Sequence, residues 1–296
     1  MTLLDRYTTK RENLLGRILR LESDIVFNNR DFSQTEVFQA GSLAAEIKKA
    51  LNKIKSLAIS NDGQQVDYKK LVQSPEYFAY RELVSHLQGF DFRSLSSPAE
   101  ALAFWINLYN ALVIDAVIQE QVQNSVTESW LGILGFFQKA AYLINGERFS
   151  LTDIEHGVLR SNRGFPYFPG PHFGPSDPRL GAIIDYIDPR IHFALNCASK
   201  SCPPVGFYSA ENLNNQLDLA TRNFLESEVK LDKNRQTIFV SRIFSWYKID
   251  FGGTQGILSF LEKHLDNPRD KNWINNNLSS IRLVFHPYDW SLNIKI

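Results

Sequence analysis

Residues 97–118, SPAEALAFWINLYNALVIDAVI, decide what kind of fold this chain adopts. The stretch opens with Ser97, Pro98 and Glu100, which is the pattern of a helix start: an N-cap hydroxyl, a proline in the first turn and a glutamate at the third helical position. From 101 to 118, apolar residues occupy nearly every side of the expected helix. A helix without a polar face is normally buried. The stretch therefore predicts a central helix around which the rest of the chain packs.

Two asparagines interrupt this apolar helix. Asn107 and Asn110 are three residues apart, so their side chains share one part of the helix surface. Buried amides need hydrogen-bond partners. We expect both residues to tie the helix to neighbouring backbone, and the alternative is that they position a ligand in a binding site.

The first 60 residues indicate helices of a different kind. Leu14, Ile18, Leu21 and Ile25 follow a helical spacing, and residues 47–58 repeat it. Both stripes are too short for a coiled coil, so we expect an N-terminal helical extension over 1–60 that packs on the main body. Binding of a protein partner through these helices is the alternative.

The remainder, 65–296, mixes helices and strands. Apolar runs predict strands at 190–197, 237–244 and 281–285, with helices beginning near 209 and 256. Because these elements do not alternate as βαβ units, the sequence predicts an α+β domain.

Composition limits the function classes. Hydrophobic residues make up 44% of the chain, and 32 basic residues balance 32 acidic ones, so no basic surplus points to nucleic acid. The N-terminus lacks the pattern of a secretory signal, and we expect no membrane span. Two cysteines do not make a disulfide-rich secreted scaffold. These features predict a soluble, cytoplasmic protein.

Both cysteines fall in one segment, 192–204, HFALNCASKSCPP. Four interpretations remain open: structural thiols in a tight turn, a cysteine nucleophile, a redox disulfide, and a metal site completed by histidines. The spacing C-x4-C lacks a second ligand pair, and no phosphate-binding or dinucleotide motif occurs, so we expect no metal and no cofactor. A small molecule or a peptide is the expected ligand.

The nucleophile hypothesis assigns roles to particular residues. Cys197 would attack an amide, ester or thioester, with His156 as general base and Glu155 orienting it. His192 is the alternative base, although in an ideal strand it would face away from Cys197. The residues expected to position or polarise a substrate are Asn107, Asn110, Arg160, Asn196, Ser199, Ser201 and Cys202. The rival hypothesis is a non-catalytic binding domain in which these residues form a structural network.

Residues 161–180 combine five prolines, three glycines and several aromatic residues without periodicity. Long loops of this kind inside a compact domain are typically lids or binding loops. We expect this loop to pack as a cover.

Three motifs carry a family resemblance: FWINLYNA at 104–111, DIEHGVLR at 153–160, and the cysteine segment 192–204. Together they resemble the DUF547 family, a domain of unknown function, and WYKIDF at 246–251 and YDWSLN at 288–293 fit its bacterial-type members. The resemblance covers roughly 65–296. It implies that the motifs belong to one domain and one site, and it transfers no reaction, substrate or cofactor.

Overall fold

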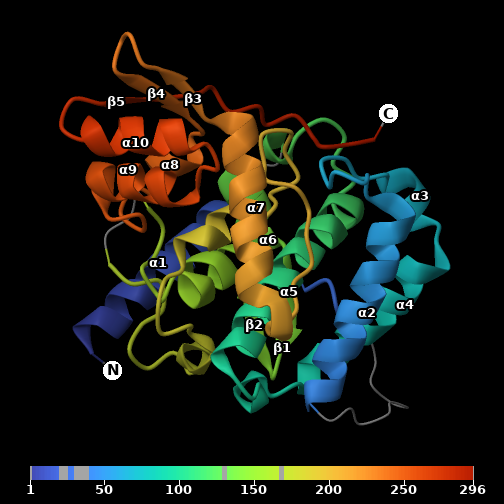
Figure 1. The fold of residues 1–296 in the computed structure, drawn as a ribbon. Helices are drawn as coiled ribbons and strands as arrows, with labels where there is room; N and C mark the ends of the chain where they lie inside the picture. Colours follow the sequence, from blue (N-terminus) through green and yellow to red (C-terminus); the bar gives the residue numbers. More distant parts are fainter. Residues whose placement is uncertain (1, 20–25, 30–39, 129–131, 167–169, 296) are drawn as a thin grey trace.

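The computed structural model describes residues 2–19, 26–29, 40–128, 132–166 and 170–295. Within these residues the chain is mostly helical and carries two small sheets (Figure 1). The α-helices are α1 (Leu3–Leu19), α2 (Ala40–Ala58), α3 (Tyr68–Val72), α4 (Pro75–Ser85), α5 (Pro98–Gln119), α6 (Ile133–Lys139), α7 (Leu213–Glu228), α8 (Ile243–Trp246), α9 (Gly253–His264) and α10 (Pro268–Asn276). The predicted α+β class is confirmed.

Helix α5 is the buried centre of the fold, as predicted. Ser97 caps it by accepting a hydrogen bond from the backbone nitrogen of Glu100 at 3.2 Å. By length and composition α5 could cross a membrane, but 89% of that stretch is buried inside the protein. In Figure 1, α2 and α4 lie on one side of α5, and α8, α9 and α10 lie on the other side. Burial of α5 on all sides is typical of a core helix.

The sheets lie at separate places. Strands β1 (Ala141–Ile144) and β2 (Glu147–Ser150) form an antiparallel hairpin. Strand β4 (Thr237–Val240) pairs antiparallel with β3 (Lys230–Asp232) and parallel with β5 (Arg282–Phe285). The strands predicted at 237–244 and 281–285 are therefore present, although the first ends at 240 and is followed by helix α8.

Two hydrophobic clusters make up the core, and they meet at residues 191–194. The larger surrounds α5, and the smaller lies among α7, α9 and β4. Ile191 and Ala194 belong to the larger cluster, whereas Phe193 belongs to the smaller one. His192, which belongs to this stretch, therefore lies at the junction of the two clusters.

The strand predicted at 190–197 is wrong. Residues Pro189–Phe193 form a 3-10 helix, η6. Asp188 caps it by accepting a hydrogen bond from the backbone nitrogen of Arg190 at 3.0 Å, and Pro189 occupies the first helical position. These capping residues start a helical turn despite the apolar run that follows. The alternation argument that set His192 and Cys197 on opposite faces does not apply.

The N-terminal helices differ in how they pack. On α2 the predicted stripe is buried in the larger cluster, including Ile47, Leu51 and Ile54. On α1, Leu14 is 59% exposed, and Leu21 and Ile25 lie outside the described residues. The predicted amphipathic packing is thus confirmed for α2, and the predicted stripe 14–25 does not hold at Leu14.

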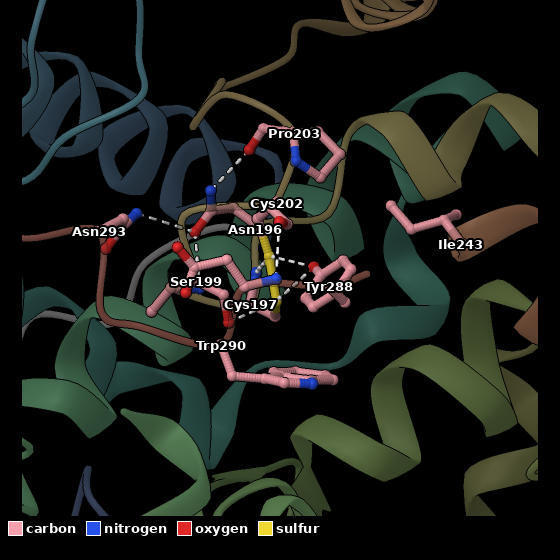
Figure 2. Close-up of a disulfide and its surroundings, with 12 residues drawn as sticks. Asn196, Cys197, Ser199, Cys202, Pro203, Ile243, Tyr288, Trp290 and Asn293 are labelled. Carbon is pink, nitrogen blue, oxygen red and sulfur yellow. Dashed lines mark hydrogen bonds between the residues drawn. A yellow bond between two sulfur atoms is a disulfide. The ribbon is translucent and has the colours of Figure 1, made fainter. Parts of the chain in front are cut away.

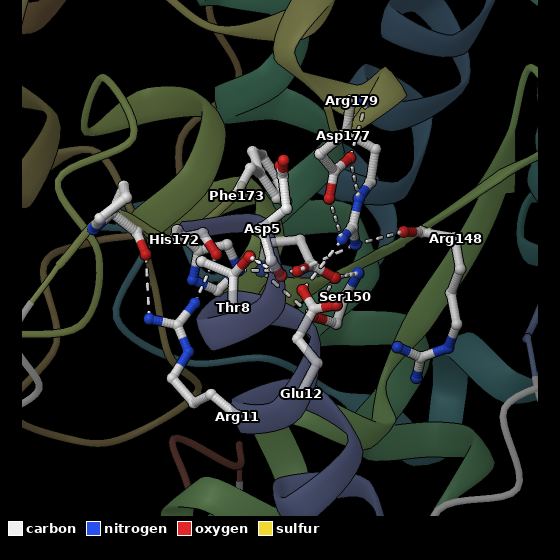
Figure 3. Close-up of polar contacts among 12 residues, drawn as sticks. Asp5, Thr8, Arg11, Glu12, Arg148, Ser150, His172, Phe173, Asp177 and Arg179 are labelled. Carbon is white, nitrogen blue, oxygen red and sulfur yellow. Dashed lines mark hydrogen bonds and ion pairs between the residues drawn. The ribbon is translucent and has the colours of Figure 1, made fainter. Parts of the chain in front are cut away.

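Polar contacts attach α1 to the loop 161–180 (Figure 3). Asp5 accepts hydrogen bonds from the backbone nitrogen and the hydroxyl of Ser176, at 2.8 and 3.0 Å. Arg11 donates to the carbonyl of Pro171, and Arg179 pairs with Glu12 at 3.0 Å. The described part of this loop therefore packs against the protein through polar groups.

Candidate functional site

A pocket of about 220 Å³ lies where the two clusters meet. One wall is apolar and includes Ile133 and Leu134 from α6, and a second wall consists of the aromatic side chains of Trp246, Tyr288 and Trp290. Its lining residues include three sets that the sequence singled out: Glu155 with His156, then His192, then the two cysteines. The expectation that these motifs share one place in the fold is therefore consistent with the structure.

Cys197 and Cys202 form a disulfide on the pocket wall (Figure 2). The turn between them places Ala198 at φ 63°, and the Asn196 side chain accepts a hydrogen bond from the Ala198 nitrogen at 2.8 Å. The Tyr288 hydroxyl contacts both sulfurs, at 3.3 and 3.1 Å. Neither cysteine is a free thiol in this state, so the predicted nucleophile Cys197 would first require reduction.

The disulfide turn is attached to the C-terminal segment that carries Tyr288 and Trp290 of the aromatic wall. The backbone nitrogen of Lys200 donates to the carbonyl of Ser291 at 2.8 Å, and the Ser201 hydroxyl accepts from the nitrogen of Asp289 at 2.9 Å. Ser199 is buried and bridges to Leu292. Neither serine is among the residues that line the pocket. The two serines therefore support the turn, and their contact with a ligand stays a prediction.

Asn107, Asn110 and Asn196 bind neighbouring backbone through their side-chain amides. For Asn107 and Asn110 this is the structural role that the sequence predicted. Asn107 donates to the carbonyl of Tyr208 at 2.8 Å and accepts from its nitrogen at 2.7 Å. Asn110 donates to the carbonyls of Ala194 and Gly206 and accepts from the nitrogen of Asn196. Asn196 in turn donates to the carbonyl of Pro203 at 2.6 Å. These amides fix the backbone behind the pocket, and none of them lines it.

His156 is held as a hydrogen-bond donor, which does not suit the base role that the sequence suggested. It lies in the π-helical segment η4 (Asp153–Leu159), and a guanidinium nitrogen of Arg160 lies 3.0 Å from its Nδ1. Arginine has only donors, so Nδ1 accepts and the ring proton resides on Nε2. Burial, together with the charge of Arg160, lowers the pKa of His156 well below its usual value. The neutral ring therefore has no lone pair free for a substrate proton.

Glu155 does not orient His156. Its carboxylate accepts hydrogen bonds from the hydroxyls of Tyr109, at 2.9 Å, and Tyr247. Thr152, which precedes the segment, makes no side-chain cap hydrogen bond. Because the segment is wound as a π-helix, Glu155 points to tyrosines from two other parts of the chain.

The carboxylate that does pair with a pocket histidine is Asp250, which the sequence reading missed. His192 Nε2 donates to Asp250 Oδ2 at 3.0 Å, and Arg160 binds both oxygens of the same carboxylate. Burial alone would raise the pKa of Asp250, but the hydrogen bonds from His192 and Arg160 lower it below its ordinary range. An ionised Asp250 holds the proton of His192 on Nε2 and leaves Nδ1 as an acceptor. The only sequence signal for Asp250 was its place in the motif 246–251.

A third histidine, His172, falls in the loop 161–180. It is buried, and its Nε2 lies 2.7 Å from Asp153 Oδ1. This pair fastens the loop to η4, and His172 is not among the pocket-lining residues.

Residues 92–225 match the model of a family described as a protein of unknown function, DUF547. These residues belong to the DUF547 family. The matched segment contains the motifs at 104–111, 153–160 and 192–204, while Asp250 and the aromatic wall lie beyond its end although they complete the same site. No curated protein and no solved structure matches the chain.

Proposed function

We propose that this DUF547 domain binds a small, mostly apolar organic molecule in the pocket beneath Tyr288 and Trp290. The observation that supports the proposal is the makeup of the pocket, about 220 Å³ with apolar and aromatic walls and few polar groups. Small-molecule sites have this makeup: apolar walls give affinity and a few polar groups fix orientation.

The walls are also held in place before any ligand binds. The disulfide joins two lining residues, and Arg160 and Asp250 fix the position of His192 in the pocket wall. A rigid site loses little conformational entropy on binding, which favours affinity. The asparagine network adds to this rigidity. The hypothesis of a non-catalytic binding domain expects such a structural network.

A neutral fluorescent probe, N-phenyl-1-naphthylamine, tests the proposal. Its emission rises in apolar surroundings, and we expect saturable binding at one site per chain. Leu134→Trp fills the pocket from α6, where Leu134 is half-buried, and should weaken binding by roughly tenfold. Leu219→Trp, at a position 53% exposed on α7, is the matched control and should bind as the wild type does. Absence of saturable binding to the wild type, or equal binding by the two variants, would contradict the proposal.

A second candidate function is thiol-dependent hydrolysis or acyl transfer after reduction of the disulfide. It is favoured by one observation: Cys197 and His192 line the same pocket, and Asp250 leaves His192 Nδ1 free to accept a proton. A reductant would release the Cys197 thiol, and His192 would take its proton as sulfur attacks the acyl carbon. The leaving group would depart with that proton, and water would then hydrolyse the thioester.

Reduction with a phosphine, followed by assay of p-nitrophenyl butyrate hydrolysis, tests this second candidate. Activity should appear only after reduction, disappear in Cys197→Ser and persist in Cys202→Ser. Iodoacetamide labelling of the reduced protein across pH should also show a Cys197 thiolate well below pH 8. Hydrolysis that is unaffected by reduction or by Cys197→Ser would rule it out.

A further inference from the structure

We infer that the molecule taken by this pocket is an organic cation: an amine or quaternary ammonium group on an apolar body, recognised by Glu155 together with the aromatic wall of Trp246, Tyr288 and Trp290. The inference rests on the proposed binding function and names the ligand class for the same pocket.

The first argument is charge. Among the described residues that line the pocket, Glu155 is the only carboxylate, and no lysine or arginine lines it. The two lining histidines are kept neutral, because burial lowers the pKa of both His156 and His192. The lining therefore offers one acidic side chain and no cationic one. An anionic ligand would be repelled from it, whereas a cationic ligand would be attracted.

The second argument is that Glu155 has no ion-pair partner among the described residues. Its side chain is buried, and within the described part of the chain its two oxygens accept from the hydroxyls of Tyr109 and Tyr247 alone. The nearby Arg160 is committed to Asp250 through two hydrogen bonds. A buried carboxylate without an opposite charge is costly, and a bound cation would supply that charge.

The third argument is the aromatic wall. The rings of Trp246 and Trp290 stack with centroids 5.5 Å apart, and the Tyr288 ring lies 4.8 Å from the first and 4.5 Å from the second. Electron-rich ring faces attract cations, tryptophan most strongly. No cationic side chain is recorded over these three rings in the described part of the chain, whereas Arg160 already lies over Tyr247 at 5.0 Å. All three residues line the pocket, so a bound cation would meet their rings without competing with a cationic side chain of the described residues.

The charge and the rings belong to one place. Glu155 lines the same pocket as Trp246, Tyr288 and Trp290. Its negative charge adds to burial in raising the pKa of Tyr288. The Tyr288 hydroxyl in turn contacts both sulfurs of the disulfide. Figure 2 shows Tyr288 beside the disulfide, with Trp290 close to the same turn. A cation in the pocket would meet the carboxylate and the rings together.

Displacement of N-phenyl-1-naphthylamine tests the inference with a matched pair of probes. Benzyltrimethylammonium carries the charge, and neopentylbenzene has nearly the same shape without it. We expect the cation to displace the dye at a concentration roughly tenfold lower than the neutral compound. Glu155→Gln should remove most of that tenfold preference, while Glu226→Gln, an exposed glutamate on α7, should keep it.

Each outcome bears on a different claim. Equal affinity of the wild type for the two compounds, or displacement by neither, would overturn the inference while dye binding left the proposed function standing. Failure of the dye to bind would contradict both the inference and the proposed function. If Glu155→Gln does not fold by circular dichroism, Trp290→Leu replaces it. The loss of that ring should weaken the cation several-fold more than the neutral compound, and an equal loss for both would contradict the inference.

Discussion

Replacement of Asp250 by asparagine removes the charge on which the back of the pocket depends. The carboxylate side chain is fully buried and receives hydrogen bonds from Arg160 and His192. The Arg160 side chain is only 4% exposed. Asparagine keeps the shape of the side chain, but it has one acceptor oxygen and no charge. The guanidinium of Arg160 would therefore stay buried without an opposite charge.

The expected loss of stability is large because one partner of a buried pair remains. Breaking such a pair costs about 3–5 kcal/mol. The neighbouring Arg163 pairs only peripherally with Asp250, at 3.7 Å and with a half-exposed side chain, so its own loss adds little. Urea unfolding at pH 7, followed by circular dichroism, should show a midpoint about 1 M or more below that of the wild type.

A matched control separates this effect from a general effect of Asp→Asn substitution. Asp266 is exposed, and Asp266→Asn should change the free energy of unfolding by no more than about 0.5 kcal/mol. A loss below about 1 kcal/mol for Asp250→Asn would refute the reasoning, because it would mean that Arg160 is compensated elsewhere.

Three further predictions concern pH, the disulfide and the central helix. Burial lowers the pKa of His156 and His192 in the folded protein, so the unfolded chain binds more protons below about pH 6.5 and stability should fall as pH drops from 7 to 5. His156→Gln should flatten that slope in urea midpoints measured at both pH values, and a pH-independent wild type would contradict the prediction. The double substitution Cys197→Ser with Cys202→Ser opens a six-residue loop and should cost about 2 kcal/mol in urea unfolding; an unchanged midpoint would count against a stabilising disulfide. Asn110→Ala strips three backbone groups of their partner and should cost about 2–4 kcal/mol in the same assay, whereas a cost under 1 kcal/mol would show that water replaces the amide.

The local features of the fold were predictable from the sequence, because they depend on neighbouring residues. The apolar run 101–118 predicted the buried helix α5, and its two asparagines predicted amides that bind backbone. The short spacing between Cys197 and Cys202 correctly indicated a tight turn. It left the disulfide as one of four alternatives. A persistent disulfide is more usual in an oxidising compartment, so the cytoplasmic location stays a prediction.

The partners within the site could not be predicted, because they come from residues far apart in the chain. Asp250 lies 58 residues from His192 and 90 from Arg160. Glu155 reaches tyrosines 46 and 92 residues away. Helical and strand periodicity does not report such pairings. The strand prediction at 190–197 failed for a different reason. An aspartate–proline cap starts a 3-10 helix there despite the apolar run after it.

The central claim is that the pocket beneath Tyr288 and Trp290 is the ligand site of this domain. A crystal structure of the protein with bound N-phenyl-1-naphthylamine tests it most directly. We predict the dye in contact with Trp246, Trp290 and Leu134, with the disulfide on the adjoining wall. A dye bound elsewhere on the protein, with this pocket empty, would contradict the account.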